Sequence, residues 1–536
     1  MREGGGMGGT AERDDLVRAG RAMAIATVAS RATGFLRVLA MGAAIGLSSG
    51  LASSYTAANT FPNALFELLF GGALASVMVP LLVRAAEQDR AAGDLYARRL
   101  LSLVIYLLGA ATLVAVLLAP QIVSVYAVGF HGAQREAAIG FTRFFLPQIF
   151  FYGMSAALAA VLNARGKMTV PMWAPAANNL VVIATAGVYL LIGGTQRLGD
   201  LTPAQSLVLS IGTTGGVIAQ MLVLAWASRR AGFRLRPKAD PRGIGVRRIL
   251  RLAGWTLTSV LAAQAAVLCT TRLMSKAAPG AIAVYGNAYT LFQLPYAVIA
   301  VTVMTGMLPR MSRAAAGRDL AAVTADLSRS LRLTGVVLLP VAAALVLLGP
   351  QITTVLFGPG GAAQAGPAVA VFGVALVPFA AYQIMMRTLA ALQDTRTQAL
   401  IGITVAAVTA TGALTAAHLV HGPLLVAVMA GCSATGYTAG ALIGAHVLRR
   451  KLGRIDGHRL ATSHARMSAA VIPAALASLA VLALIGPAAG DGRAGSLATL
   501  AAVALAGAGL YAAASRWMRV PEFGIVVGAF PFARHR

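Results

Sequence analysis

Long apolar runs dominate this chain. They recur from residue 20 to residue 514, and short segments holding most of the charged residues separate them. A helix needs ~20 apolar residues to cross the ~30 Å hydrocarbon layer of a membrane. The pattern predicts spans at 20–46, 55–82, 99–119, 138–162, 172–193, 205–227, 253–273, 283–308, 332–350, 367–392, 398–418, 423–448, 467–486 and 495–514. We therefore expect an all-α polytopic membrane protein with about 14 transmembrane helices.

The composition excludes a water-soluble protein. Hydrophobic residues make up 58% of the 536 and charged residues only 11%, whereas a soluble domain carries roughly 25% charge. The two cysteines, Cys269 and Cys432, both lie in apolar runs and provide no disulfide framework.

The distribution of the cations predicts the topology. The chain has 44 Lys and Arg against 17 Asp and Glu. With a cytoplasmic N-terminus, 35 of the cations fall on the inner side and five on the outer side, which is the bias of the positive-inside rule. Both termini are then cytoplasmic. The basic charge reflects topology, and no nucleic-acid partner is expected.

An internal repeat predicts two halves. The segment 78–86 resembles 307–315, and Leu162-Asn163 resembles Leu392-Gln393. Both pairs lie at the inner ends of spans, which favours two six-helix lobes in a parallel pseudo-repeat plus two C-terminal helices. Chance similarity in an Ala- and Leu-rich chain is the alternative. The expected organisation is a disordered cytoplasmic tail at 1–19, an N-lobe at 20–228, a basic loop at 229–252, a C-lobe at 253–448, a basic loop at 449–466, two further spans at 467–514 and a cytoplasmic tail at 515–536.

Five charged residues lie well inside predicted spans, away from the span ends: Arg31, Arg37, Glu67, Arg143 and Arg387. Each costs ~2.5–3.5 kcal/mol at a helix centre and is a functional hypothesis by default. Four arginines against one carboxylate favour an anionic ligand, because the guanidinium binds phosphate bidentately. Arg31 and Glu67 both fall near mid-membrane, so an ion pair between them is expected. Arg387 is near enough to the cytoplasm to snorkel as the alternative.

The second span carries a polar stripe. Thr56, Asn59, Asn63 and Glu67 recur at helical spacing, which is typical of a wall that faces water. Hydrogen bonding to a neighbouring helix is the alternative reading. Pro62 lies within the stripe and is expected to bend or open the helix.

Catalytic and metal motifs are missing from the sequence. It contains no HExxH motif, no P-loop and no carboxylate pair in a span. Only His418 and His421 have the spacing of helical metal ligands, and no carboxylate or thiol is close to them in sequence. We expect no metal, no cofactor and no enzymatic activity.

Several motifs together form a recognisable pattern. They are Ser30–Arg37, Gly46, Ala58–Asn63, Gly72-Ala73, Val79-Pro80, Arg143, Pro147, Leu162-Asn163, Gly166, Pro171, Pro175, Asn179, Leu291–Tyr296, Leu308–Arg310 and Ala391–Thr397. This pattern resembles the MurJ/MviN lipid II flippases of the MOP exporter superfamily, in an actinobacterial-type version, which implies a bacterial plasma membrane. The resemblance implies fourteen helices, a cationic central cavity between two lobes, and a groove for a polyprenyl tail on the last two helices. It also implies that Arg31 and Arg37 hold the diphosphate of the lipid. Other family arginines are replaced, at Phe66, Glu67 and Thr290.

The expected function is therefore a flippase that moves an undecaprenyl-diphosphate-linked peptidoglycan precursor, lipid II, to the outer leaflet by alternating access. The candidate substrate-binding residues are Arg31, Arg37, Asn59, Asn63, Glu67, Arg143 and Arg387. The expected partners are the anionic polyprenyl-diphosphate lipid and membrane lipids. Two alternatives stay open: an exporter of another lipid-linked glycan or amphiphile, and a transport-inactive paralogue that acts as a scaffold for cell-wall synthesis or division proteins.

Overall fold

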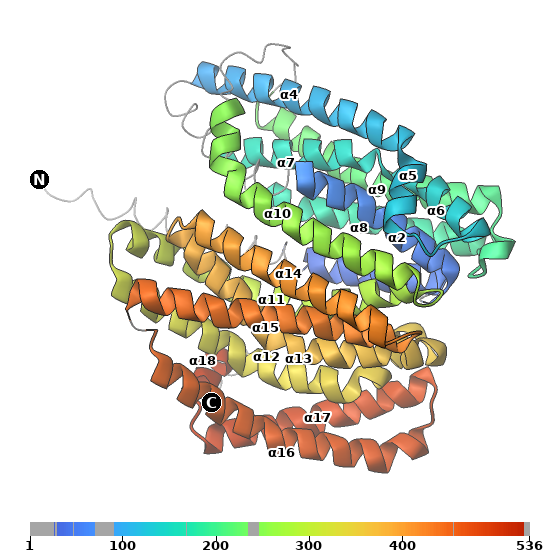
Figure 1. Cartoon of the computed structure of the whole chain (residues 1–536). Coiled ribbons are helices and arrows are strands. Elements are labelled where there is room, and N and C mark those ends of the chain that lie inside the picture. Colours follow the sequence, from blue (N-terminus) through green and yellow to red (C-terminus); the bar gives the residue numbers. More distant parts are fainter. Residues whose placement is uncertain are drawn as a thin grey trace, which may run out of the picture. The chain divides into compact units, whose positions relative to one another are not determined.

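The computed structural model describes residues 26, 29–46, 48–69, 90–167, 169–233, 246–453 and 455–529. Every regular element within these residues is helical (Figure 1). The predicted all-α polytopic fold is therefore confirmed. The predicted tail at 1–19 and the first copy of the repeat at 78–86 lie outside the described residues.

The helices of the first half begin with an unlabelled helix over residues 29–45. The helices that follow are α2 (Gly50–Leu69), α4 (Arg90–Leu117), α5 (Ala119–Tyr126), α6 (Gly132–Phe145), α7 (Gln148–Ala164), α8 (Thr169–Leu191), the short η1 (Leu198–Asp200) and α9 (Pro203–Arg230).

The second half consists of longer helices. They are α10 (Val246–Ser275), α11 (Ala281–Ala316), α12 (Leu320–Phe357), α13 (Pro359–Ala391), α14 (Thr395–Leu419), α15 (Leu424–Leu452), α16 (Gly457–Ala489), α17 (Arg493–Trp517) and α18 (Pro521–Ala529).

Within the described residues, 12 helical segments are long and apolar enough to cross a membrane, from Ala97–Leu117 to Arg493–Trp517. They correspond one for one to the third to fourteenth predicted spans. The helix over 29–45 and α2 are helical as expected but are not among the twelve. The polar stripe of α2 lowers the hydropathy of that helix.

Pro62 and Pro147 have different effects on their helices. Pro62 lies inside α2, which continues through it to Leu69, so the helix is not opened there. The predicted span 138–162 is instead divided into α6 and α7 at Leu146 and Pro147. The interruption is slight, because Leu146 keeps αR geometry and its N–H still donates to the Thr142 carbonyl at 2.9 Å.

The chain divides into two compact units. Unit 1 comprises residues 1–45, 54–125 and 131–260. In it α9 packs against α7 and α8, and α4 packs against α7. Two glycines of α9 permit this closeness, because a Cβ on Gly212 would lie 2.1 Å from the Thr185 hydroxyl and one on Gly216 would lie 2.4 Å from Asn178 Oδ1. Small residues let transmembrane backbones approach in this way.

Unit 2 comprises residues 46–53, 126–130 and 261–536. Its centre is α13, which packs against α11, α12 and α15, while α14 packs on α15. Aromatic rings fill the space between α11, α13 and α15. Phe292 stacks on Phe372 with 5.0 Å between ring centroids, and Tyr437 lies 4.7 Å from Phe379. Edge-to-face and offset contacts of this kind add to the burial of the rings.

A buried ion pair ties the C-terminal helices to the rest of unit 2. Glu522, in α18, is 2% exposed and accepts hydrogen bonds from Arg332 of α12 and from Ser463 of α16. Arg332 is 8% exposed. The segment that was expected to be only a cytoplasmic tail at 515–536 thus contains a helix docked on α12 and α17.

We expect Glu522→Ala to destabilise the protein by about 3–5 kcal/mol, because it leaves the Arg332 charge buried without its partner. The readout is the melting temperature of the detergent-solubilised full chain. Asp491→Asn, which removes an exposed carboxylate from the α16–α17 turn, serves as the control and should leave the melting temperature unchanged. Equal melting temperatures for Glu522→Ala and wild type would show that the pair contributes nothing.

A second ion pair lies where α13 meets α14, outside the membrane-spanning segments. Asp394 caps α14 by accepting from the Thr397 N–H at 3.1 Å, and its Oδ2 lies 2.6 Å from Lys451 Nζ. Burial alone raises the pKa of Asp394, but the hydrogen bonds from Lys451 and Thr397 and the Lys451 charge outweigh it, so this pKa lies below its usual value.

A carboxylate with a depressed pKa stabilises the folded state above its unfolded pKa, about 3.9 for Asp, and loses that contribution as the pH falls through the folded value. We therefore expect the wild type to lose melting temperature below about pH 4 more steeply than Asp394→Asn. The measurement is a melting series from pH 7 to pH 3. Asp319→Asn, which removes another helix-capping carboxylate, is the control for a lost cap, and parallel curves for wild type and Asp394→Asn would contradict the assignment.

Candidate functional site

The strongest candidate site lies in unit 1, around Arg37. This half-buried residue lies in the helix over 29–45. Its guanidinium interacts electrostatically with the hydroxyls of Tyr55 and Tyr152 and forms a hydrogen bond with Tyr55. Three helices, the one over 29–45, α2 and α7, thus meet at one cation.

The Tyr55 hydroxyl has a defined orientation. It lies 2.7 Å from Thr213 Oγ1, and the Thr213 hydroxyl already donates to the Leu209 carbonyl at 2.6 Å. Tyr55 must therefore donate to Thr213, which leaves its oxygen lone pairs free to accept from Arg37. The ring is held edge-to-face by Phe141 and Phe145, with centroids 5.8 and 5.3 Å away.

Tyr152 extends the polar cluster toward α8. Its hydroxyl is in hydrogen-bonding contact with the Asn178 side chain, and its ring lies 5.9 Å from that of Phe66. Asn178 is 7% exposed, and its Oδ1 is buried without a hydrogen-bond partner among the described residues. A buried unsatisfied acceptor costs about 1–3 kcal/mol, and this oxygen faces α9, where a Cβ on Gly216 would lie 2.4 Å from it.

The helix over 29–45 is fixed to α8 by Asn179. The Asn179 amide donates to the Ser30 carbonyl and to the Thr33 hydroxyl, both at 3.2 Å. Gly34 lies opposite, where a Cβ would contact the same amide at 3.4 Å. The arginines of this helix are therefore presented by a backbone that is anchored on one side.

Arg31 is placed differently from Arg37. The two are six residues apart, which rotates one about 120° from the other around the helix axis. Arg31 is exposed and has no hydrogen bond or ion pair to any described residue. Its expected ion pair with Glu67 is not formed. Glu67 is half-buried in α2 and likewise has no ionic partner within the described chain. That expectation was wrong because depth along two helices does not fix the direction of their side chains.

The remaining candidates are scattered. Asn59 is half-buried and its Oδ1 has no partner among the described residues, whereas Asn63 of the same stripe is exposed. Arg143 is exposed in the last turn of α6, where a cation interacts favourably with the helix dipole. Arg387 is half-buried in α13 and belongs to unit 2, whereas the other six candidates belong to unit 1.

Sequence reasoning missed Tyr55, Tyr152 and Asn178. A signal for Tyr55 existed, because Tyr55, Asn59 and Asn63 follow one another at four-residue spacing on one face of α2. No comparable pattern marks Tyr152 in α7 or Asn178, which directly precedes Asn179 in α8. The described residues contain no group of three His, Cys, Asp or Glu side chains that could hold a metal ion.

We expect Tyr55→Phe to lower stability by about 0.5–1.5 kcal/mol, the usual net value of a lost hydrogen bond. The substitution removes the hydroxyl that joins Arg37 to Thr213 and keeps the packing of the ring. The melting temperature of the solubilised protein is the readout. Tyr106→Phe, at a tyrosine of α4 that is 59% exposed, is the matched control, and equal effects of the two substitutions would contradict the role of Tyr55.

Comparison with known proteins shows which family this chain resembles. The family model described as lipid II flippase MurJ matches residues 41–502. A probable lipid II flippase MurJ of Rhizobium meliloti is 28% identical over 394 residues, which cover 71% of this chain and 72% of that protein. The lipid II flippase MurJ of Burkholderia cenocepacia is 27% identical over 395 residues, covering 72% and 75%.

Solved structures share the fold. A lipid II flippase MurJ in an inward closed conformation aligns with a TM-score of 0.74 and 18% identity, covering 93% of this chain and 99% of that one. An inward-facing multidrug resistance MATE family transporter of the MOP superfamily aligns with a TM-score of 0.59 and 16% identity, covering 81% and 92%. At these identities the structural likeness establishes the fold alone.

Proposed function

The chain belongs to the MurJ family, and we propose that it is a flippase that carries lipid II from the inner to the outer leaflet of the bacterial plasma membrane. Lipid II is the substrate named for its relatives. The protein is a transporter rather than an enzyme under this proposal, and its substrate is an anionic lipid whose diphosphate must pass through the hydrocarbon layer.

One observation carries the proposal. Among the described residues of unit 1, Arg31 is exposed without a protein partner, while Arg37 of the same helix contacts phenols and pairs with no carboxylate. A phenol can accept a hydrogen bond from a guanidinium but does not neutralise its charge. The two cations are therefore available to an anion, and a diphosphate offers the bidentate geometry that guanidinium prefers.

The proposed roles of the two arginines differ. Arg31, exposed and free of described contacts, makes the first contact with the diphosphate. Arg37, oriented by Tyr55, holds the diphosphate deeper along the same helix. Further substrate contacts are proposed for the remaining candidates, which the lipid reaches as the protein alternates between inward and outward access. They are Asn59, Asn63, Glu67, Arg143 and Arg387. An inside-negative potential favours outward movement of the anion by ~2.3 kcal/mol per charge per 100 mV.

The proposed orientation places both termini in the cytoplasm. It is supported by the charge bias of the sequence, with Arg449, Arg450 and Lys451 at one end of α15 and Arg396 at the adjoining start of α14. These cations mark the inner side by the positive-inside rule.

Transport of fluorescent lipid II tests the proposal. The purified full chain is reconstituted in vesicles, and the appearance of the probe in the opposite leaflet is measured. Hydrogen bonds to charged groups contribute about 1.5–3 kcal/mol, so Arg31→Ala or Arg37→Ala should slow transport by about tenfold or more. Arg37→Lys should fall between wild type and Arg37→Ala, because the charge remains while the planar fork is lost.

Arg197→Ala is the matched control, since Arg197 is an exposed arginine next to η1 and its loss should leave the rate unchanged. Transport by wild type that is insensitive to both Arg31→Ala and Arg37→Ala would refute the assigned roles. Movement of other polyprenyl-linked glycans but not lipid II would favour the exporter alternative. No transport of any lipid, together with capture of cell-wall synthesis or division proteins, would favour the scaffold.

A further inference from the structure

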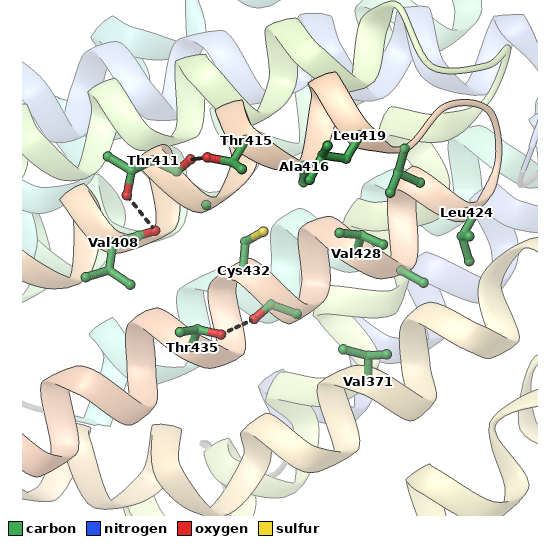
Figure 2. Close-up of a pocket in the computed structure, with 14 residues that line it drawn as sticks. Val371, Val408, Thr411, Thr415, Ala416, Leu419, Leu424, Val428, Cys432 and Thr435 are labelled. Atoms are coloured by element: carbon green, nitrogen blue, oxygen red, sulfur yellow. Dashed lines mark hydrogen bonds between the residues drawn. The ribbon is translucent and has the colours of Figure 1, made fainter.

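Unit 2 carries an apolar groove. Its volume is about 840 Å³, within the range of sites that hold a small ligand. Residues of α14 and α15 form its two sides, and Val371 of α13 contributes to its floor (Figure 2). The lining residues are Val371, Val408, Thr411, Gly412, Thr415, Ala416, Leu419, Val420, Leu424, Ala427, Val428, Gly431, Cys432 and Thr435.

The hydroxyl groups of the groove offer no donor to a ligand. Thr411 donates to the Ala407 carbonyl at 2.8 Å, Thr415 donates to the Thr411 carbonyl at 3.0 Å, and Thr435 donates to the Gly431 carbonyl at 3.0 Å. Each hydroxyl proton is thus used within its own helix. The groove suits a hydrocarbon ligand, and a polar head group would find no free hydroxyl donor among these threonines.

Small residues create the concavity. Gly412 and Gly431 lie on facing helices, and Figure 2 shows the Cys432 sulfur directed into the space between α14 and α15. A Cβ on Gly412 would lie 3.3 Å from that sulfur, whereas one on Gly431 would meet only Val371 Cγ1, at 3.7 Å. Larger side chains at these positions would narrow the groove.

The length of the groove matches one leaflet. Along α14 it runs from Val408 to Leu419, eleven residues or ~17 Å at 1.5 Å per residue, close to half of a ~30 Å hydrocarbon layer. It ends beside the α14–α15 turn, at the end of α15 opposite its basic residues Arg449, Arg450 and Lys451. With the proposed orientation this is the outer end. The exposed His418 and His421 lie there, at head-group level.

We propose that this groove is a binding site for one acyl chain of a phospholipid in the outer leaflet. The acyl chain enters the groove beside Leu419 and Leu424 and ends near Val408 and Thr435. Its head group lies at the level of His418 and His421, whose ring N–H groups can donate to phosphate. The site depends on the proposed orientation of the protein but not on transport of lipid II.

Photocrosslinking tests the site. The full chain is reconstituted in vesicles of phosphatidylethanolamine and phosphatidylglycerol, in which the phosphatidylglycerol carries a diazirine in one acyl chain, and crosslinked peptides are mapped by mass spectrometry. Wild type should crosslink preferentially and saturably at 408–419 and 424–435. Val428→Phe fills the groove and should reduce crosslinking there by about tenfold, as expected when the burial of about two methylene groups is lost.

Two further variants make the result decisive. Gly431→Val fills the same groove from another position, which covers the case in which Val428→Phe fails to fold. Leu414→Phe adds a similar ring on α14, at a residue that is 48% exposed and does not line the groove, and should crosslink like wild type.

Two crosslinking results would overturn the proposal. The first is an unchanged yield at 408–419 and 424–435 in folded Val428→Phe and Gly431→Val. The second is a wild-type yield there that is no higher than at Leu505 of α17, which is 79% exposed. Displacement of the probe by unlabelled undecaprenyl phosphate at a far lower mole fraction than by phosphatidylglycerol would also overturn it, since the groove would then hold a polyprenyl chain. The readout needs no transport, so it is independent of the proposed function.

Discussion

A guanidinium in a hydrocarbon layer needs partners that satisfy its N–H groups, and the choice of partner decides what the cation can do. A carboxylate would neutralise Arg37 and leave it structural. Tyr55 accepts a hydrogen bond from Arg37, Tyr152 interacts with the cation electrostatically, and both leave its charge intact. Because Tyr55 is itself fixed by Thr213 and by two phenylalanine rings, the cation is held in place without being cancelled. The chemistry proposed for unit 1 depends on this arrangement.

The packing of unit 1 serves the same arrangement. Gly216 lets α9 approach α8 so closely that the Asn178 side chain has no room on that side, and Asn178 in turn contacts Tyr152. Asn179, the next residue along α8, holds the helix of Arg31 and Arg37 through Ser30 and Thr33. Asn179 thus binds α8 to the helix that carries the arginines. Its neighbour Asn178 binds α8 to Tyr152, a phenol beside Arg37.

The sequence predicted most of the fold because hydropathy and helix length are local quantities. The third to fourteenth spans were found in this way, and α2 was found as a helix although its polar stripe makes it less apolar than the twelve spans. Contacts between helices were harder to predict. The depths of Arg31 and Glu67 were compatible with an ion pair, but their directions around the helix axes were not predicted. α18 was missed because nine residues are too few to register as a span, and its docking depends on the distant Arg332.

The Arg332–Glu522 pair has a consequence for the end of the chain. Since α18 bonds to α12 and α16 at once, and Tyr511 of α17 donates to the Val336 carbonyl of α12 at 2.6 Å, the last two long helices are bound to α12 at several points. A protein shortened to end before Pro521 would keep the twelve apolar segments. It would lose Glu522, and the buried Arg332 guanidinium would have no carboxylate partner. The helix α18 is thus part of the folded body of unit 2, and a purification tag belongs after Ala529 rather than in place of α18.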